Sequence, residues 1–96
     1  MKINEIKIGL SGVSVEAKVI DVEETREVMT RYGRRRVANA TIEDDTGEIV
    51  LSLWEDQIDS VKPGDKITVT GAYVSEFQGR LQLNIPKSGK MEVLEG

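Results

Sequence analysis

The sequence predicts an all-β protein in which five short strands form a small barrel. Apolar and polar residues alternate at period two along several short segments, which is typical of strands with one buried face. Turn signals rich in glycine, proline or aspartate separate these segments. The 96 residues are enough for one compact core but too few for a large two-sheet sandwich. These observations favour a small barrel.

The first strand is expected over residues 13–22. Apolar residues occupy the odd positions from Val13 to Val19 and the even positions from Ile20 to Val22. A change of parity inside one strand indicates a bulge or a sharp coil, which small barrels require.

The second strand is expected over residues 35–43 and the third over residues 48–54. The segment "DDTGE" between them predicts a hairpin turn, in which Gly47 supplies the permissive backbone. The odd positions of the third strand are large and aliphatic: Ile49, Leu51 and Leu53. Trp54, the single tryptophan, has the opposite parity and is therefore expected on the outer face.

One or two helical turns are expected around residues 57–61, ending at Pro63-Gly64. The fourth strand is expected over residues 66–74 and the fifth over residues 80–85. Gly79 lies at the tight turn between these two strands.

The whole chain is expected to form one domain. Its parts are a leading segment over residues 1–12 with a short turn near Ile6–Leu10, the barrel over 13–86, and an extension over 87–96 in which 90–94 can add an edge strand. The order is a long coiled first strand, two hairpins, an interruption after the third strand and a closing pair. It matches the Greek-key oligonucleotide/oligosaccharide-binding (OB) fold, with an SH3-like barrel as the alternative.

The composition excludes several classes of site. The chain has no cysteine and no histidine, so disulfides, Cys/His zinc sites and histidine acid–base catalysis are excluded. No nucleophile–base pair and no glycine-rich phosphate loop is visible, so neither an enzyme nor a cofactor is expected. The acidic triplet Glu43, Asp44 and Asp45 is expected to form a turn with solvated carboxylates, not a metal site.

The sequence also favours a cytoplasmic protein without a membrane partner. No apolar run approaches the ~18 residues that a membrane span needs. Lys7 interrupts the N-terminal stretch in which a signal peptide would need an unbroken apolar core.

Positive charge is clustered although the net charge is −4. The segment from Arg26 to Ile42 carries five arginines and one acid. Such a cluster is typical of a surface that binds polyanions, and also of a solvated turn. The alanines of the second strand occupy even positions, so alternation directs Arg36 inward and Arg35 outward. Arg31 and Arg34 flank a turn at Gly33.

Four aromatic residues are the other candidate site residues: Tyr32, Trp54, Tyr73 and Phe77. Tyr32 and Phe77 lie in the loops that flank the usual nucleic-acid surface of an OB-fold, which is the outer face of the second and third strands. Simple alternation buries Tyr73, whereas a bulge at Gly71-Ala72 turns it outward. We expect a platform on which bases stack. The alternative is that Trp54 caps the barrel and Phe77 packs under its loop.

Three segments carry a resemblance to a known family: "VSVEAKVIDVEE" (13–24), "ATIEDDTGEIVLSLW" (40–54) and "VKPGDKITVTGAYVSEFQGRLQL" (61–83). They resemble archaeal single-stranded DNA-binding proteins and the OB-fold domains of archaeal replication protein A. The resemblance implies that Trp54, Tyr73 and Phe77 stack on bases, which places Tyr73 outward. Single-OB members carry a flexible tail that recruits partners. This chain stops at Gly96 without one, which raises the alternative of one domain from a longer protein.

The expected function is non-enzymatic binding of single-stranded DNA, with little sequence specificity, in DNA replication or repair. The expected binding residues are Trp54, Tyr73, Phe77, Tyr32, Arg35, Arg31, Arg34 and Arg80. Further replication or repair proteins, or further OB domains of the same chain, are the other expected partners. Two alternatives stay open: a protein-interaction OB module of a larger replication protein A, and an RNA- or tRNA-binding OB domain.

Overall fold

The computed structural model describes residues 1–86 and 88–94, without the side chain of Phe77. The elements, in chain order, are η1 (Ile3–Glu5), β1 (Val13–Val22), β2 (Arg26–Thr30), β3 (Gly33–Asp44), β4 (Gly47–Trp54), α1 (Asp56–Ser60), β5 (Lys66–Phe77), β6 (Arg80–Asn84) and β7 (Lys90–Leu94). No helix among these residues is long and apolar enough to cross a membrane.

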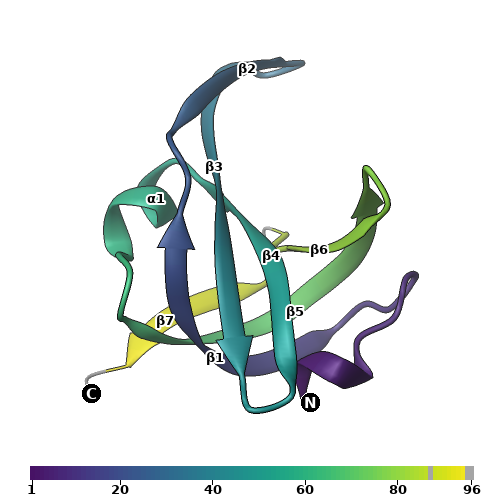
Figure 1. The fold of residues 1–96 in the computed structure, drawn as a ribbon. Helices are drawn as coiled ribbons and strands as arrows, with labels where there is room; N and C mark the ends of the chain where they lie inside the picture. Colours follow the sequence, from purple (N-terminus) through teal and green to yellow (C-terminus); the bar gives the residue numbers. More distant parts are fainter. Residues whose placement is uncertain (87, 95–96) are drawn as a thin grey trace.

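The strands form one sheet that closes into a barrel (Figure 1). The strand order is β1-β3-β4-β6-β5-β7, and β1 also pairs with β5, which closes the ring. β2 pairs only with β3, and β7 pairs with β5 as the expected edge strand. The expected helical turn between the third and fourth barrel strands is α1. The predicted all-β barrel is therefore confirmed.

Two bulges coil the barrel at the predicted places. The register between β1 and β3 shifts between Val19 and Asp21, where the apolar parity of the sequence changes. The register between β1 and β5 shifts as well, near Gly71, whose φ is 74°. Burial in β5 moves from odd to even positions at this bulge, so Ala72 is buried and Tyr73 is exposed.

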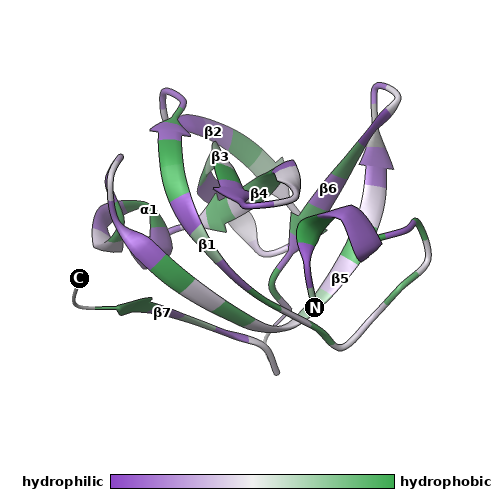
Figure 2. Ribbon diagram, turned by 60° about the horizontal axis from the view of Figure 1, so that its bottom comes forward, coloured by the Kyte–Doolittle hydropathy of each residue, from purple (hydrophilic) through white to green (hydrophobic). Residues whose placement is uncertain are grey.

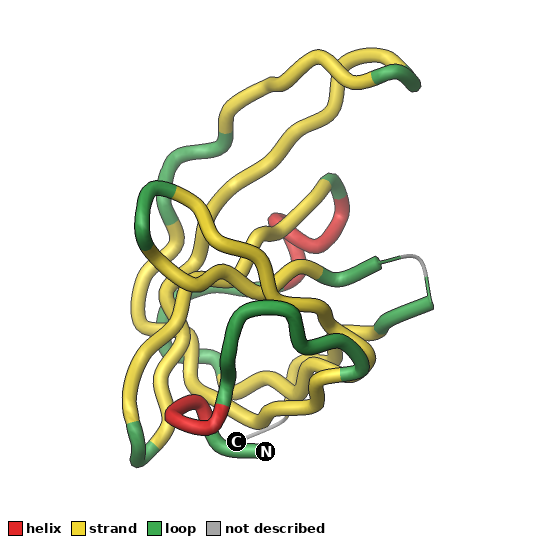
Figure 3. The backbone as a smooth tube through the Cα atoms, turned by 90° about the vertical axis from the view of Figure 1, so that its right-hand side faces the viewer, coloured by secondary structure: helices red, strands yellow, loops and turns green. Residues whose placement is uncertain are grey.

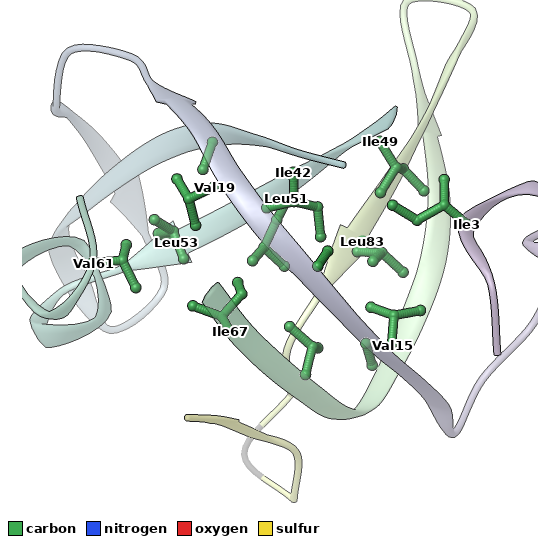
Figure 4. Close-up of a cluster of buried hydrophobic side chains, with 14 of the residues drawn as sticks. Ile3, Val15, Val19, Ile42, Ile49, Leu51, Leu53, Val61, Ile67 and Leu83 are labelled. Atoms are coloured by element: carbon green, nitrogen blue, oxygen red, sulfur yellow. The ribbon is translucent and has the colours of Figure 1, made fainter. Parts of the chain in front are cut away.

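Aliphatic side chains fill the barrel (Figure 4). The largest of those with almost no exposure are Ile42, Leu51, Leu53, Ile67 and Leu83. No aromatic residue belongs to this core in the described part of the chain. Figure 2 shows the corresponding alternation of hydrophobic and hydrophilic residues along the strands. The aromatic residues therefore have roles other than filling the centre of the barrel.

The segment expected as a loop between the first two strands is a β-hairpin. Residues Arg26–Thr30 pair with Gly33–Val37, and the hairpin projects beyond the barrel (Figures 1 and 3). Thr30 stabilises the turn, because its hydroxyl donates to the carbonyl of Gly33 and accepts from the amide of Tyr32. The segment has no apolar period, since both of its faces carry charged residues, and hydrophobic periodicity therefore missed it.

Asp44 corrects the prediction of a fully solvated acidic turn. Its carboxylate accepts hydrogen bonds from the amides of Ile3 (2.8 Å), Thr46 (2.7 Å) and Gly47 (3.2 Å), and from the hydroxyl of Thr46. Burial raises the pKa of Asp44, but the hydrogen bonds outweigh it and lower the pKa to about 2. Asp44 thereby attaches the N-terminal segment to the turn between β3 and β4. The described residues contain no group of three acids placed to hold a metal ion.

Candidate nucleic-acid interface

Trp54 lies on the outer face of the barrel. It is the cross-strand partner of Val37, and the next pair on the same face is Asn39 and Ser52. Its neighbour Leu53 points into the core and is fully buried. Trp54 itself is partly exposed. The alternation in this strand predicted that Leu53 is buried and that Trp54 lies on the outer face, and both predictions are confirmed.

This outer face continues without a break from β4 through β6 to β5. The pairs that carry it are Val50 with Gln82, Gln82 with Ser75, and Asn84 with Tyr73. The amide of Gln82 donates to the hydroxyl of Ser52, and the amide of Asn84 donates to the hydroxyl of Ser75 (2.8 Å). Tyr73 retains 44% exposure at the far side. Two aromatic residues therefore lie on one face, separated by a belt of hydrogen-bonded polar side chains.

A groove of about 440 Å³ borders this belt at Gln82. Glu23, Arg26 and Asn39 line it on one side, and Gln78, Arg80 and Gln82 line it on the other. The turn of the β5–β6 hairpin consists of Gln78 and Gly79, which both have positive φ. Two-residue hairpins of this kind hold their strands in a well-defined register. The groove is therefore bounded by two hairpins, β2–β3 and β5–β6.

The register of the β2–β3 hairpin sorts the clustered arginines onto two faces. Arg26 pairs with Val37, and Arg35 lies two residues before Val37 on β3, so both share the face of Trp54. Both are exposed, and neither forms an ion pair with any described residue. Arg26 lines the groove, and Arg35 lies further along the same face of the hairpin.

Arg36 and Arg34 lie on the opposite face and have carboxylate partners. Arg36 contacts Asp59 at 3.1 Å and Glu55 at 3.7 Å, and its backbone amide donates to Glu55 at 2.9 Å. The hydrogen bond with Asp59 and the nearby negative charges raise the pKa of Arg36. Arg34 forms a looser pair with Glu27 at 3.7 Å. Arg36 therefore points neither into the core nor into the groove.

The structure thus brings together part of the expected site. Arg80 lines the groove, and Trp54, Tyr73 and Arg35 lie on the strand-paired face that carries it. Arg31 and Tyr32 occupy the hairpin tip, where Tyr32 is 77% exposed. The backbone of Phe77 pairs with Arg80 at the end of the β5–β6 hairpin, and its side chain lies outside the described part. Arg26 and Asn39 line the groove but were not among the expected binding residues. A hairpin predicted from the turn before Gly33 would have paired Thr30 with Gly33 and, four residues further along each strand, Arg26 with Val37.

A family model described as "Single-stranded DNA binding protein Ssb-like, OB fold" matches residues 6–93. The chain belongs to this family. A curated relative of this Ssb-like chain is the single-stranded DNA-binding protein Ssb of Saccharolobus solfataricus, with 30% identity over 90 residues. The match covers 94% of this chain and 61% of that protein. Replication factor A of Methanothermobacter thermautotrophicus is 31% identical over 86 residues, which are 84% of this chain and 11% of that protein.

Solved structures confirm the OB-fold of the Ssb-like chain. The OB domain of a Thermoplasma acidophilum protein superposes with a TM-score of 0.87 and 26% identity, covering 100% of this chain and 87% of that one. A domain of replication protein A from Methanococcus maripaludis has a TM-score of 0.79 and 31% identity. The match covers 99% of this chain and 94% of that one. The resemblance to archaeal single-stranded DNA-binding proteins and replication protein A domains is thereby confirmed.

Proposed function

We propose that this domain binds single-stranded DNA without enzymatic activity and with little sequence specificity. Bases stack on Trp54, Tyr73 and Phe77, and phosphates contact Arg26, Arg35 and Arg80. One observation carries the proposal: Trp54 and Tyr73 lie on one strand-paired face, beside arginines that have no acidic partner among the described residues.

The polar belt between the two aromatic residues supports stacking as the mode of binding. An aromatic ring accepts any base, and each stacked base contributes roughly 1–3 kcal/mol. The belt is occupied by its own hydrogen bonds, Gln82 with Ser52 and Asn84 with Ser75. These four side chains are therefore paired with each other, which limits their reading of base edges.

The distribution of charge supports a polyanionic ligand despite the net charge of −4. Glu55 and Asp59 lie beside Arg36 on the opposite face of the hairpin, and Asp45 pairs with Lys2 at the other end of the barrel. Arg26, Arg35 and Arg80 form no ion pair with a described residue, although Glu23 lines the groove together with Arg26 and Arg80. Arg31 and Tyr32 at the hairpin tip contact a longer strand. The strand register places Arg26 on the face of Trp54 and Arg34 on the opposite face, so we assign the phosphate contact to Arg26 and not to Arg34.

A titration of the tryptophan fluorescence tests the proposal. Oligo-dT should quench Trp54 in a saturable way, because a stacked base covers the indole. A duplex should bind more weakly, since its bases are not free to stack. Stronger binding of oligo-rU than of oligo-dT would favour an RNA ligand instead. Absence of binding to every single strand would overturn the proposal.

A second role rests on the similarity to Replication factor A, of which this chain matches 11%. The domain would then be a protein-interaction OB module of a larger replication protein. The titration separates the two roles, since a dedicated interaction module would leave oligo-dT unbound.

A further inference from the structure

β4 and β6 leave an opening between their first residues. The two strands run parallel and pair only at Val50–Gln82 and Leu51–Leu83. Their starts lie apart, with η1 nearby (Figure 1). A pocket of about 380 Å³ occupies this region, with Ile3, Ile49 and Leu81 among its lining residues. Figure 4 shows Ile3 beside Ile49.

The floor of this pocket is apolar, and its rim is charged. Ile3 and Ile49 are almost fully buried, so they form an apolar floor. Glu48 and Arg80 line the same pocket and are exposed, and neither forms an ion pair with a described residue. An apolar floor with one unpaired acceptor group and one unpaired donor group suits a flat heterocycle with polar edges.

The pocket is continuous with the groove described above. Val50, Arg80 and Leu81 line both hollows. A strand that follows the groove past the β5–β6 hairpin therefore reaches this pocket. Glu48 lies opposite Glu43 on the neighbouring strand, so the local charge repels a phosphate. A base, not the backbone, is the part of the strand that fits here.

The geometry points to guanine as the base that this pocket selects, an inference that rests on the proposed function. Guanine presents N1–H and N2–H side by side, which match the two oxygens of the Glu48 carboxylate. It also presents O6 and N7, to which arginine donates in the commonest specific base contact, here from Arg80, whose remaining N–H groups stay free for a phosphate. Cytosine offers only its amino group to a carboxylate. Thymine offers one N–H between two carbonyl oxygens, which the carboxylate repels.

Oligo-dT carrying one central substitution tests this inference. The substituted bases are guanine, hypoxanthine (guanine without its 2-amino group) and cytosine. Wild-type protein should bind the guanine oligonucleotide about 5- to 10-fold more tightly than oligo-dT, the lower range for one bidentate contact. Hypoxanthine should be intermediate, because it keeps N1–H and loses the amino donor.

Glu48→Gln and Glu43→Gln form a matched pair of variants. Each removes one negative charge from the same end of the barrel, but Glu43 does not line the pocket. The measured quantity is the ratio of guanine to thymine affinity, which cancels a general electrostatic gain. Glu48→Gln should lower this ratio, because the amide keeps only one of the two acceptor oxygens, and Glu43→Gln should leave it as in the wild type.

The outcomes separate this inference from the proposed function. Equal affinity for all four oligonucleotides would overturn the guanine pocket and leave single-strand binding intact. An equal loss of the ratio in both variants would show a charge effect and would also overturn it. Failure to bind any oligonucleotide would overturn the proposed function, and the pocket with it.

Discussion

Trp54 and Val37 are cross-strand partners at the end of β4, where the β2–β3 hairpin leaves the barrel. Val37 is buried although it lies on the outer face, whereas Trp54 keeps part of its surface exposed. The tryptophan is therefore held against the barrel on one side and is open to a ligand on the other.

Replacing Trp54 by alanine should reduce the affinity for oligo-dT. Loss of one stacked base costs about 1–3 kcal/mol, or about 5- to 150-fold in Kd. Because the variant has no tryptophan, fluorescence anisotropy of a labelled oligonucleotide is the appropriate measurement. Trp54→Phe should keep part of the affinity. A lower melting temperature with unaltered affinity would assign Trp54 to packing alone.

At Tyr73, a substitution can raise the affinity for single-stranded DNA as well as lower it. Tyr73→Trp should raise the affinity for oligo-dT and Tyr73→Ala should lower it, because the larger ring offers more stacking area. The residue is 44% exposed, so neither change should shift the melting temperature by more than a few degrees. Equal affinities for tyrosine, tryptophan and alanine at this position would remove it from the binding face.

The bulge that exposes Tyr73 depends on Gly71. Its φ of 74° is unfavourable for a side chain, and an added Cβ would lie 3.2 Å from the Cα of Gly89. Gly71→Ala should therefore destabilise the fold by about 1–2 kcal/mol, measurable as a lower midpoint in urea unfolding. Gly79→Ala is the control, because it shares a positive φ and has no atom near the added Cβ. Equal losses in both variants would mean that φ alone matters.

The arginines should differ in their effect on the salt dependence of binding. Each phosphate neutralised on a single strand contributes about 0.7 to the slope of log affinity against log salt. The double variant Arg26→Ala/Arg35→Ala should flatten that slope by about 1.4. Arg34→Ala should change it less, because Arg34 lies on the other face and pairs with Glu27. A larger effect of Arg34 would place the strand on the opposite face of the hairpin.

Asp44 should make stability depend on acidic pH. Its pKa is lowered to about 2 in the folded protein from an ordinary value of 3.8. The stabilisation is therefore complete above about pH 4 and disappears as the pH falls towards 2. The carboxylate is partly exposed, so we expect about 1 kcal/mol from it, not the full linkage value. Asp44→Asn should remove this loss between pH 4 and 2, whereas Asp45→Asn, with its exposed Lys2 partner, should preserve it.

The alternation of apolar and polar residues was sufficient to predict the features that depend only on residues close together in the sequence. The core positions of β4, the bulge in β1 and the face of Trp54 all follow from side-chain parity. Alternation alone could not place Tyr73, because a bulge moves the buried side chains from odd to even positions and has no unique local sequence signal. Its outward position was expected only from the family resemblance.

Contacts between distant segments could not be predicted in the same way. The acidic partners of Arg36 come from α1 and the residue before it, and one amide bound by Asp44 comes from Ile3, 41 residues away in the sequence. The pocket between β4 and β6 likewise combines Ile3 with Arg80. Such pairs arise when the barrel closes, and no periodicity within one segment reports them.

The ion pairs of Arg36 imply that ionic strength acts on this molecule in two places. They connect the base of the β2–β3 hairpin to Glu55 and to Asp59 in α1, and all three side chains are substantially exposed. Added salt screens these pairs as well as the contacts with phosphate. A hairpin held less firmly at its base presents Arg26 and Arg35 less consistently. The measured salt slope then exceeds about 0.7 per phosphate bound, and the excess disappears when Arg36 is replaced by glutamine.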